Sequence, residues 1–162
     1  MKRGQSILAG PQRGLTWNVE EKEMSVMAHP VEAIIATADA AIANEDFDAL
    51  MDIYCEDALL VIRPGVNVTG KAQIRRAFEA IAAHFNHSVR VSQAGIMVLE
   101  ASDTALVLAK TVVSTSNVPD VTRNATYVFR KDSSGCWHCA IDNSYGHELL
   151  SAEEAPGVLP EE

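Results

Sequence analysis

The sequence predicts an α+β fold in which helices form the first half of the chain and an antiparallel sheet forms the second. Two observations support this prediction. Apolar residues recur at helical spacing through residues 30–85, and after His87 they follow the period of two that strands require. Short turn signals separate the later segments, so neighbouring strands are expected to run antiparallel, with the helices covering one face of a curved sheet.

Three segments in the first half are predicted to be helices. The first covers residues 30–44, where Pro30 suits the opening position and apolar side chains share one face. Asp46 can cap the second helix, whose apolar stripe is expected to run as far as Tyr54. Gly70 opens the third helix. Its inward side chains are expected to be Ile74, Phe78, Ile81 and Phe85.

The strands are predicted from runs of β-branched and aromatic residues between turn signals. A short buried strand at residues 58–62 stops at Arg63-Pro64-Gly65, because proline and glycine favour a turn. Four further strands are expected at residues 89–99, 104–114, 121–131 and 136–143. The middle two are fairly apolar on both faces, so the outer face of the sheet is expected to pack against a second copy of the chain.

The charge distribution excludes two classes of partner. The 162 residues carry 13 Lys and Arg against 22 Asp and Glu, a formal charge of −9. Nucleic acid and anionic membranes both require clustered positive charge, so neither is expected as a partner. The sequence has no apolar run of roughly 18 residues and no signal-peptide pattern at its start, so a cytoplasmic location is expected.

Three parts of the chain are distinguished by composition. Residues 1–27 contain several glycines and are expected to form a flexible leader. Residues 28–147 are expected to form the folded domain. Residues 148–162 carry Glu but no Lys or Arg, and are expected to form an acidic, solvated tail.

The sequence carries none of the common cofactor or metal motifs. The phosphate loop, the dinucleotide-binding fingerprint, the serine-hydrolase elbow and the zinc-protease motif are all absent. Cys136 and Cys139 have the spacing of a redox pair, but residues three apart on a strand point to opposite faces. A zinc site would need a second pair of ligands, and His84 and His87 are better explained as residues at a helix end. No cofactor and no metal are therefore expected.

Two polar residues near the end of the last predicted strand are candidates for a functional site. If Trp137, Cys139 and Ile141 share the inner face with Asn143, this amide either satisfies a hydrogen bond in the core or orients a ligand. By the same alternation Asp142 points to the other face. It is the one candidate for a catalytic acid or base, and the alternative is an interface or surface carboxylate.

Five other residues are expected around a cavity. Tyr54 is predicted to be a packing residue first, with a hydroxyl that could also meet a ligand. Arg63 would meet an anionic group at the cavity mouth, and Asn124 would help to orient the ligand. Phe78 and Trp137 would form walls.

Several segments resemble a known superfamily. They read NEDFDAL at 44–50, YCEDA at 54–58, GKAQI at 70–74, GCW at 135–137 and IDN at 141–143. Together they resemble the nuclear-transport-factor-two-like superfamily, which includes ketosteroid isomerase and SnoaL-like polyketide cyclases, and are most similar to small bacterial members with the SgcJ/EcaC-type ending. The resemblance implies a cystatin-like cone of three N-terminal helices on a curved antiparallel sheet, an apolar cavity at its open end and a homodimer through the outer sheet face.

The catalytic residues of ketosteroid isomerase do not carry over to this chain. Followed without gaps, the resemblance puts the family's donor tyrosine at Ala38 and its base at Ile62. The second acid falls at residues 124–126, where no carboxyl group exists. Only Tyr54 matches, in a supporting role. An aliphatic side chain cannot abstract a proton, so isomerisation by that mechanism is not expected.

Two hypotheses about function follow. In the first, a homodimer binds a small apolar or amphipathic organic molecule in the cone, with an isomerase or cyclase type of activity left open. In the second, the domain is a non-catalytic homodimeric association module. A cavity of several hundred Å³ with polar groups pointing into it would favour the first. Large side chains that seal the cone would favour the second.

Overall fold

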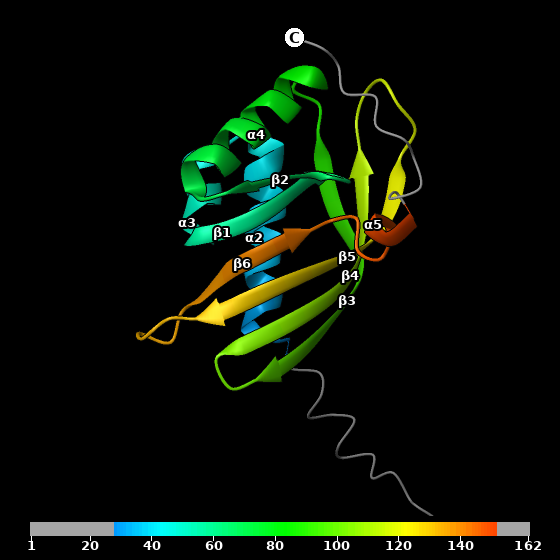
Figure 1. The fold of residues 1–162 in the computed structure, drawn as a ribbon. Helices are drawn as coiled ribbons and strands as arrows, with labels where there is room; N and C mark the ends of the chain where they lie inside the picture. Colours follow the sequence, from blue (N-terminus) through cyan, green and yellow to red (C-terminus); the bar gives the residue numbers. More distant parts are fainter. Residues whose placement is uncertain (1–27, 152–162) are drawn as a thin grey trace, which may run out of the picture.

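The computed structural model describes residues 28–151, in which helices pack against a curved six-stranded sheet (Figure 1). The helices are α2 (Pro30–Asn44), α3 (Phe47–Asp52), α4 (Lys71–His84) and the short α5 (Glu148–Ser151). The strands are β1 (Tyr54–Arg63), β2 (Val66–Thr69), β3 (Arg90–Ala101), β4 (Thr104–Ser114), β5 (Val121–Lys131) and β6 (Trp137–Asn143). The α+β prediction is confirmed, although the described residues form four helices rather than three.

The boundaries of α2 follow from its local sequence. The imidazole Nδ1 of His29 accepts a hydrogen bond from the backbone amide of Val31 at 3.1 Å. Pro30 lacks an amide hydrogen and so fits the first helical position without losing a bond. The helix ends at Glu45, whose left-handed backbone, at φ 54°, returns its amide to the carbonyl of Ile42.

The second helix is shorter than the sequence predicts. Asp46 caps α3 as expected, because its carboxylate accepts a hydrogen bond from the amide of Ala49 at 3.1 Å. The helix then ends at Asp52, and Tyr54 begins β1 instead of completing the helical stripe. Tyr54 pairs with Cys139 of β6, a partner that lies too far along the chain for local periodicity to reveal.

The sheet has the strand order β2-β1-β6-β5-β4-β3. The predicted meander is confirmed, since β3 to β6 pair antiparallel and the bounds of β4 and β5 match the expected strands. The prediction of a wholly antiparallel sheet is wrong for one pair, because β1 runs parallel to β6. The long connection through α4 and the meander allows this arrangement, which a hairpin could not. The sequence also gave no sign of β2, which pairs with β1 beyond the turn at Pro64.

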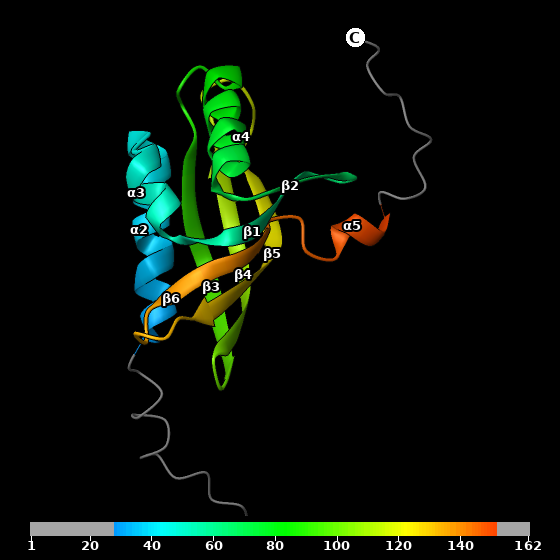
Figure 2. The same ribbon diagram turned by 60° about the vertical axis from the view of Figure 1, so that its left-hand side comes forward.

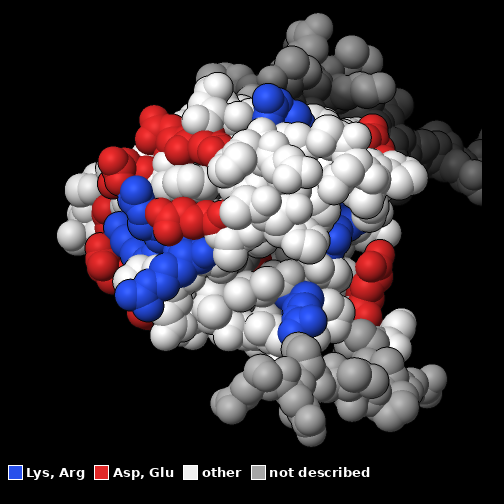
Figure 3. Space-filling model, turned by 90° about the horizontal axis from the view of Figure 1, so that it is seen from above, with Lys and Arg blue, Asp and Glu red and all other residues white. Residues whose placement is uncertain are grey.

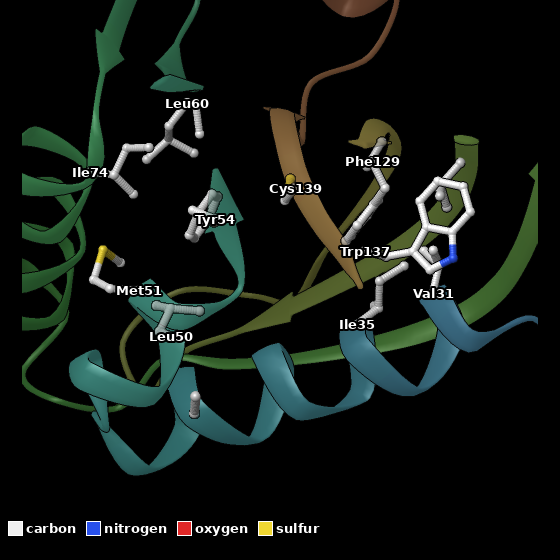
Figure 4. Packing of buried hydrophobic residues seen from close by; sticks show 14 of the residues in the cluster. Val31, Ile35, Leu50, Met51, Tyr54, Leu60, Ile74, Phe129, Trp137 and Cys139 are labelled. Atoms are coloured by element: carbon white, nitrogen blue, oxygen red, sulfur yellow. The ribbon is translucent and has the colours of Figure 1, made fainter. Parts of the chain in front are cut away.

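The core lies between the helices and one face of the sheet. In Figures 1 and 2, α2 runs beside the long strands and α4 lies across the end near β1 and β2. Val31 and Ile35 of α2 pack toward Trp137 and Phe129, which come from β6 and β5 (Figure 4). Ile74 of α4 is completely buried in the same cluster. The apolar face of each helix therefore covers the inner face of the sheet, as the periodicity predicted.

A bulge in β6 reverses the side-chain alternation near the end of the strand. Trp137 and Cys139 face the core. Cys139 pairs with Phe129 of β5, and Ile141 pairs with the adjacent residue Val128. Ala140 is therefore an extra residue with no partner on β5, which defines a β-bulge. Beyond it Ile141 is 41% exposed, and Asp142 turns inward. The expectation that Asp142 points away from the interior is therefore wrong.

The ends of the chain remain a matter of prediction. The expected leader at residues 1–27 lies outside the described residues, as does all of the expected tail beyond residue 151. Among residues 28–151 no helix is both long enough and apolar enough to cross a membrane. The cytoplasmic location stays a prediction.

Gly146 provides a test of how the chain is held after β6. Its backbone is left-handed, at φ 54°, and a Cβ there would overlap the carbonyl oxygen of Asn124. We expect Gly146→Ala to lower the free energy of unfolding by about 3 kcal/mol or more, measured by urea denaturation. Gly135 is the matched control, since it is also left-handed but has open space around it, so Gly135→Ala should cost only about 1 kcal/mol. Equal losses in the two variants would contradict the crowding at Gly146.

Candidate functional site

A cavity of about 310 Å³ lies between the helices and the inner face of the sheet. This volume falls within the range of small-molecule sites, roughly 300–1,000 Å³. Its rim includes the exposed residues Val118 and Pro119 of the β4–β5 loop, with Phe85 following α4. Figure 3 views the molecule from this end, where much of the central surface is uncharged, the largest group of charged side chains lies on the left and a few others lie around it.

Most of the cavity wall is apolar. Helices α2 and α4 contribute Ile35, Ile42 and Phe78, and the sheet contributes Phe129. Polar side chains from separate elements interrupt this wall, and six of them form two hydrogen-bonded groups. An apolar molecule of modest size would be complementary to such a wall, while the few polar groups would determine its orientation.

Asp39 is an acidic residue on the inner face of α2. Its two carboxylate oxygens accept hydrogen bonds from Nε2 of Gln93 at 3.1 and 3.3 Å. Partial burial raises the pKa of Asp39 to about 6, because the apolar surroundings hydrate the charged form poorly. The Gln93 hydrogen bonds oppose this rise in pKa, and the nearby Asp142 carboxylate adds to it. The group therefore titrates close to neutral pH.

Asp142 is the second carboxyl group in the cavity, placed there by the bulge at Ala140. The hydroxyl of Tyr54 donates a hydrogen bond to its Oδ2 atom at 2.6 Å. Burial raises the pKa of Asp142, and the Tyr54 hydrogen bond lowers it in part. Burial also raises the pKa of the Tyr54 phenol, with a further contribution from the Asp142 charge. Tyr54 therefore stays protonated and acts as a donor.

A second chain of hydrogen bonds leads from Asp39 to Tyr127. The hydroxyl of Thr111 donates to Oε1 of Gln93 at 2.9 Å and lies 3.0 Å from the hydroxyl of Tyr127. Because Thr111 uses its only hydrogen on Gln93, Tyr127 is the donor in the second contact. Burial raises the pKa of Tyr127, so its phenol also stays protonated. Gln93 is thus fixed in the orientation that presents its amide to Asp39.

The structure brings together only some of the residues predicted for the site. Tyr54 and Phe78 line the cavity, and Asp142 joins them. Arg63 is exposed at the end of β1, and Asn124 is exposed on β5, so neither lines the cavity. Trp137 is also not a wall of the cavity. It is buried in the core, with Nζ of Lys131 4.7 Å above its ring.

Asn143 organises a turn and does not line the cavity. Its Oδ1 atom accepts hydrogen bonds from the amides of Tyr145 and Gly146, at 3.1 and 3.0 Å. Its Nδ2 atom donates to Thr126 on β5 at 3.2 Å and to the carbonyl of Gly146 at 3.3 Å. Asn143 was expected either to satisfy a hydrogen bond within the protein or to orient a ligand, and its contacts match the first alternative. The turn brings the ring of Tyr145 under the guanidinium of Arg123, 4.0 Å away.

Nine polar residues that line the cavity were missed from the sequence: Asp39, Glu45, Gln93, Thr111, Thr115, Arg123, Tyr127, Ser144 and Tyr145. A signal existed for Asp39, which follows Ile35 by four residues and therefore shares its helical face. A signal also existed on β5, where Arg123 and Tyr127 are each two residues from the buried Ala125 and therefore share its inward face.

The cysteines and histidines do not add a metal centre to the described part of the chain. Between residues 28 and 151 no three His, Cys, Asp or Glu side chains form a group that could hold a metal ion. Cys136 is exposed, whereas Cys139 is buried on the inner face of β6 and lines the cavity. Both are free thiols in the structure.

A family model for the SnoaL-like domain matches residues 31–140. The match covers well over half of the chain, and the protein belongs to this family. The predicted resemblance is therefore confirmed. No curated protein sequence matches the chain.

Solved structures share the fold at low sequence identity. An NTF2-like protein with a cystatin-like fold from Novosphingobium aromaticivorans has a TM-score of 0.62 and 17% identity, over 90% of this chain and 100% of its own. A candidate dehydratase of the NTF2-like family from Streptomyces avermitilis has a TM-score of 0.58 and 20% identity, over 75% of this chain and 94% of its own. A third structure comes from Xanthomonas campestris and is described as a candidate calcium/calmodulin-dependent protein kinase II association domain. Its TM-score is 0.59 and its sequence identity is 21%, over 70% of this chain and 82% of its own. The shared fold is a cystatin-like cone.

The raised pKa of Asp39 predicts how stability depends on pH. Between the ordinary value of 3.8 and the folded value of about 6, the folded protein binds more protons than the unfolded chain. This carboxyl group therefore lowers stability as the pH rises from about 4 to about 6. We expect Asp39→Asn to remove that loss, so that its stability relative to wild type increases through this window and stays constant above it.

Urea denaturation at several pH values measures this difference. Asp103→Asn, in the exposed β3–β4 turn, is the matched control and should follow the wild-type curve at every pH. A constant difference between Asp39→Asn and wild type from pH 4 to pH 7 would show that Asp39 has an ordinary pKa.

Proposed function

We propose that the protein binds a small, largely apolar organic molecule in the cone and moves a proton within it. The observation that carries this proposal is the presence of two carboxyl groups, Asp39 and Asp142, in an apolar cavity of about 310 Å³. An acid or base is most effective when its pKa lies near the working pH, and burial moves both groups in that direction. The reaction class is isomerisation, cyclisation or dehydration.

The two carboxyl groups are suited to different roles. Asp39, with a pKa of about 6, is mostly ionised at neutral pH and would accept a proton from a carbon atom of the ligand. Asp142 has its Oδ2 atom occupied by the Tyr54 hydroxyl, and its other oxygen would carry the proton that is returned to the ligand.

The comparisons support the reaction class but not a particular substrate. The Streptomyces avermitilis neighbour is described as a candidate dehydratase, and the family takes its name from SnoaL-like domains. The proposed base differs from the one expected for ketosteroid isomerase, because Asp39 lies on α2 and position 62 is an isoleucine. The proposal therefore rests on this chain's own pair of carboxyl groups.

The proposed base can be tested without knowing the natural substrate. The probe is 5-nitrobenzisoxazole, a small apolar molecule whose ring opens to a coloured nitrophenolate when a base removes its carbon-bound proton. We expect the protein to accelerate this reaction, with a rate that rises with pH around a midpoint near 6. Asp39→Asn should lower the rate by about 100-fold, the size typical of a lost general base.

Two further variants make this experiment specific. Asp142→Asn removes a nearby charge that raises the pKa of Asp39, so the midpoint of the pH profile should move to lower pH. Asp103→Asn, outside the cavity, should leave both the rate and the midpoint unchanged. The proposal fails if the wild-type protein does not exceed buffer, or if Asp39→Asn retains the wild-type rate.

A second function, association between two copies of the chain, is favoured by a separate observation. The register places Leu99, Leu106, Val128 and Ile141 in one row across β3 to β6 on the outer face of the sheet. Three of these side chains are strongly exposed: Leu99 by 50%, Ile141 by 41% and Leu106 by 38%. Contiguous exposed apolar surface of this kind marks an interaction site.

A homodimer through the outer face is compatible with a pocket on the inner face. The Xanthomonas campestris neighbour, whose description names an association domain, supports the idea that this fold can serve assembly. Because the sheet separates the row at Leu106 from the carboxyl groups, pairing of two sheets would leave the cavity intact. Association is therefore proposed as an addition to ligand binding.

The dimer is tested by sedimentation velocity at micromolar concentration. We expect the wild-type protein to sediment as a dimer and Leu106→Lys to sediment as a monomer, since a charge in the centre of the row would be buried by pairing. Leu150→Lys is the control. Leu150 is 70% exposed on α5 and is not one of the residues of the row, so its replacement should leave the dimer unchanged. A wild-type monomer, or a dimer that tolerates Leu106→Lys, would exclude this interface.

A further inference from the structure

Two buried side-chain atoms of residues 28–151 have no hydrogen-bond partner: Oγ1 of Thr115 and Nε of Arg123. Both residues line the same cavity, on β5 and just beyond the end of β4. Buried polar groups in folded proteins are nearly always paired, because leaving one unpaired costs free energy. The convergence of both unpaired groups on one cavity indicates that a missing partner belongs there.

Arg123 is held in place although it has no acidic partner. Its guanidinium lies 4.0 Å from the centre of the Tyr145 ring, an arrangement that attracts a cation to an aromatic face. The ring itself is fixed by the turn that Asn143 organises. Tyr145 therefore orients the guanidinium while leaving its N–H groups available for an acceptor.

The charges around the cavity leave Arg123 as an unneutralised cation. It is the only Lys or Arg among the lining residues. The three lining carboxylates contact other groups: Asp39 accepts from Gln93, Asp142 from Tyr54, and Glu45 pairs with His87 at 2.8 Å. No ion pair to Arg123 occurs among the described residues. In a chain of net charge −9, an unpaired arginine inside a cavity is best explained by an anion from elsewhere.

The register gives the spacing between this cation and the carboxyl groups. Arg123 lies opposite Thr111, and four residues further along β5 Tyr127 lies opposite Asp142. Four residues of strand span about 13 Å. A ligand whose charged end meets Arg123 would therefore extend its apolar part toward Asp142. It would pass Asp39, whose partner Gln93 lies in the same cross-strand row as Arg123. Such a ligand needs an apolar body of one or two rings, or an equivalent chain.

We propose that the cavity takes an organic oxyanion, with an apolar body in the cone and a carboxylate or similar group held by Arg123 and the hydroxyl of Thr115. The proposal rests on the proposed function for the location of the ligand, and it adds the class of the ligand. A guanidinium suits this role because it presents N–H groups to an oxyanion in a fixed planar geometry. Arg123 thus has the role that the sequence suggested for Arg63.

The test uses two fluorescent probes that share the same apolar body. They are 1-anilinonaphthalene-8-sulfonate, which carries an oxyanion, and N-phenyl-1-naphthylamine, which does not. We expect Arg123→Gln to weaken binding of the sulfonate by about tenfold or more, the loss typical of a hydrogen bond to a charged group. Binding of the neutral probe should stay unchanged. Arg63→Gln, which alters an exposed arginine outside the cavity, should change neither affinity.

A second arginine variant guards against misfolding. If circular dichroism shows that Arg123→Gln is unfolded, Arg123→Lys preserves the charge above Tyr145 and loses only the planar donor geometry. It should weaken the sulfonate by less than Arg123→Gln would, and again leave the neutral probe unchanged. Equal losses for the two probes, or no loss for the sulfonate, would overturn the proposal.

A third comparison separates this inference from the proposed function. Ala38 lines the cavity and Ala40, two residues later on α2, is exposed. Ala38→Trp should fill the cavity and abolish binding of the neutral probe, while Ala40→Trp should not. If Ala38→Trp has no effect, the probes bind elsewhere and the proposed function fails with the inference. If Ala38→Trp abolishes binding but Arg123→Gln does not discriminate between the probes, only the oxyanion inference fails.

Discussion

One extra residue in β6 decides which side chains enter the cone. Without the bulge at Ala140, strict alternation would direct Ile141 inward and leave Asp142 on the outer face. With it, Asp142 meets the hydroxyl of Tyr54 at 2.6 Å, and Ile141 joins the apolar row on the outside of the sheet. The same irregularity therefore determines both the polarity of the cavity and the composition of the exposed face. Bulges are common next to functional sites because they redirect a side chain without changing the fold.

Each of the two carboxyl groups in the cavity accepts hydrogen bonds from one side chain and lies in a wall that is otherwise mostly apolar. Gln93 donates a hydrogen bond to Asp39, and its own orientation is fixed by the hydrogen bonds of Thr111 and Tyr127. Tyr54 donates a hydrogen bond to Asp142. Burial still dominates, since the pKa of both carboxyl groups is raised. A structural ion pair would have lowered these pKa values instead, as happens at the exposed Asp57, whose pKa is lowered by Arg130. The raised pKa values support the proposed role of both carboxyl groups in proton transfer.

The two faces of the sheet differ in what they contact, and each carries one of the two proposed functions. The inner face contacts α2, α3 and α4 and leaves a hollow, because these helices cover only part of it. The outer face presents large apolar side chains across four strands. Each task uses alternate residues of the same strands, so a change in one need not disturb the other. This division explains how one fold can serve both ligand binding and assembly.

Local patterns in the sequence determined the secondary structure. Helical spacing, Pro30 at the start of the first helix, the cap at Asp46 and the period-two runs predicted α2, the start of α3, α4 and the four meander strands, because each depends only on neighbouring residues. The resemblance to the SnoaL-like family then gave the cone. The site was determined by longer-range contacts. Phe78 lies on the apolar stripe of α4, as the periodicity predicted, whereas Tyr54 reaches the cavity from β1 and not from the helix in which it was expected. Four other predicted residues do not line the cavity, because strand pairing decides which side chains enter it: Arg63, Asn124, Trp137 and Asn143. Only the tertiary structure placed Asp142 inward and Arg123 over Tyr145, because a bulge and a turn depend on strand pairing that no single segment specifies.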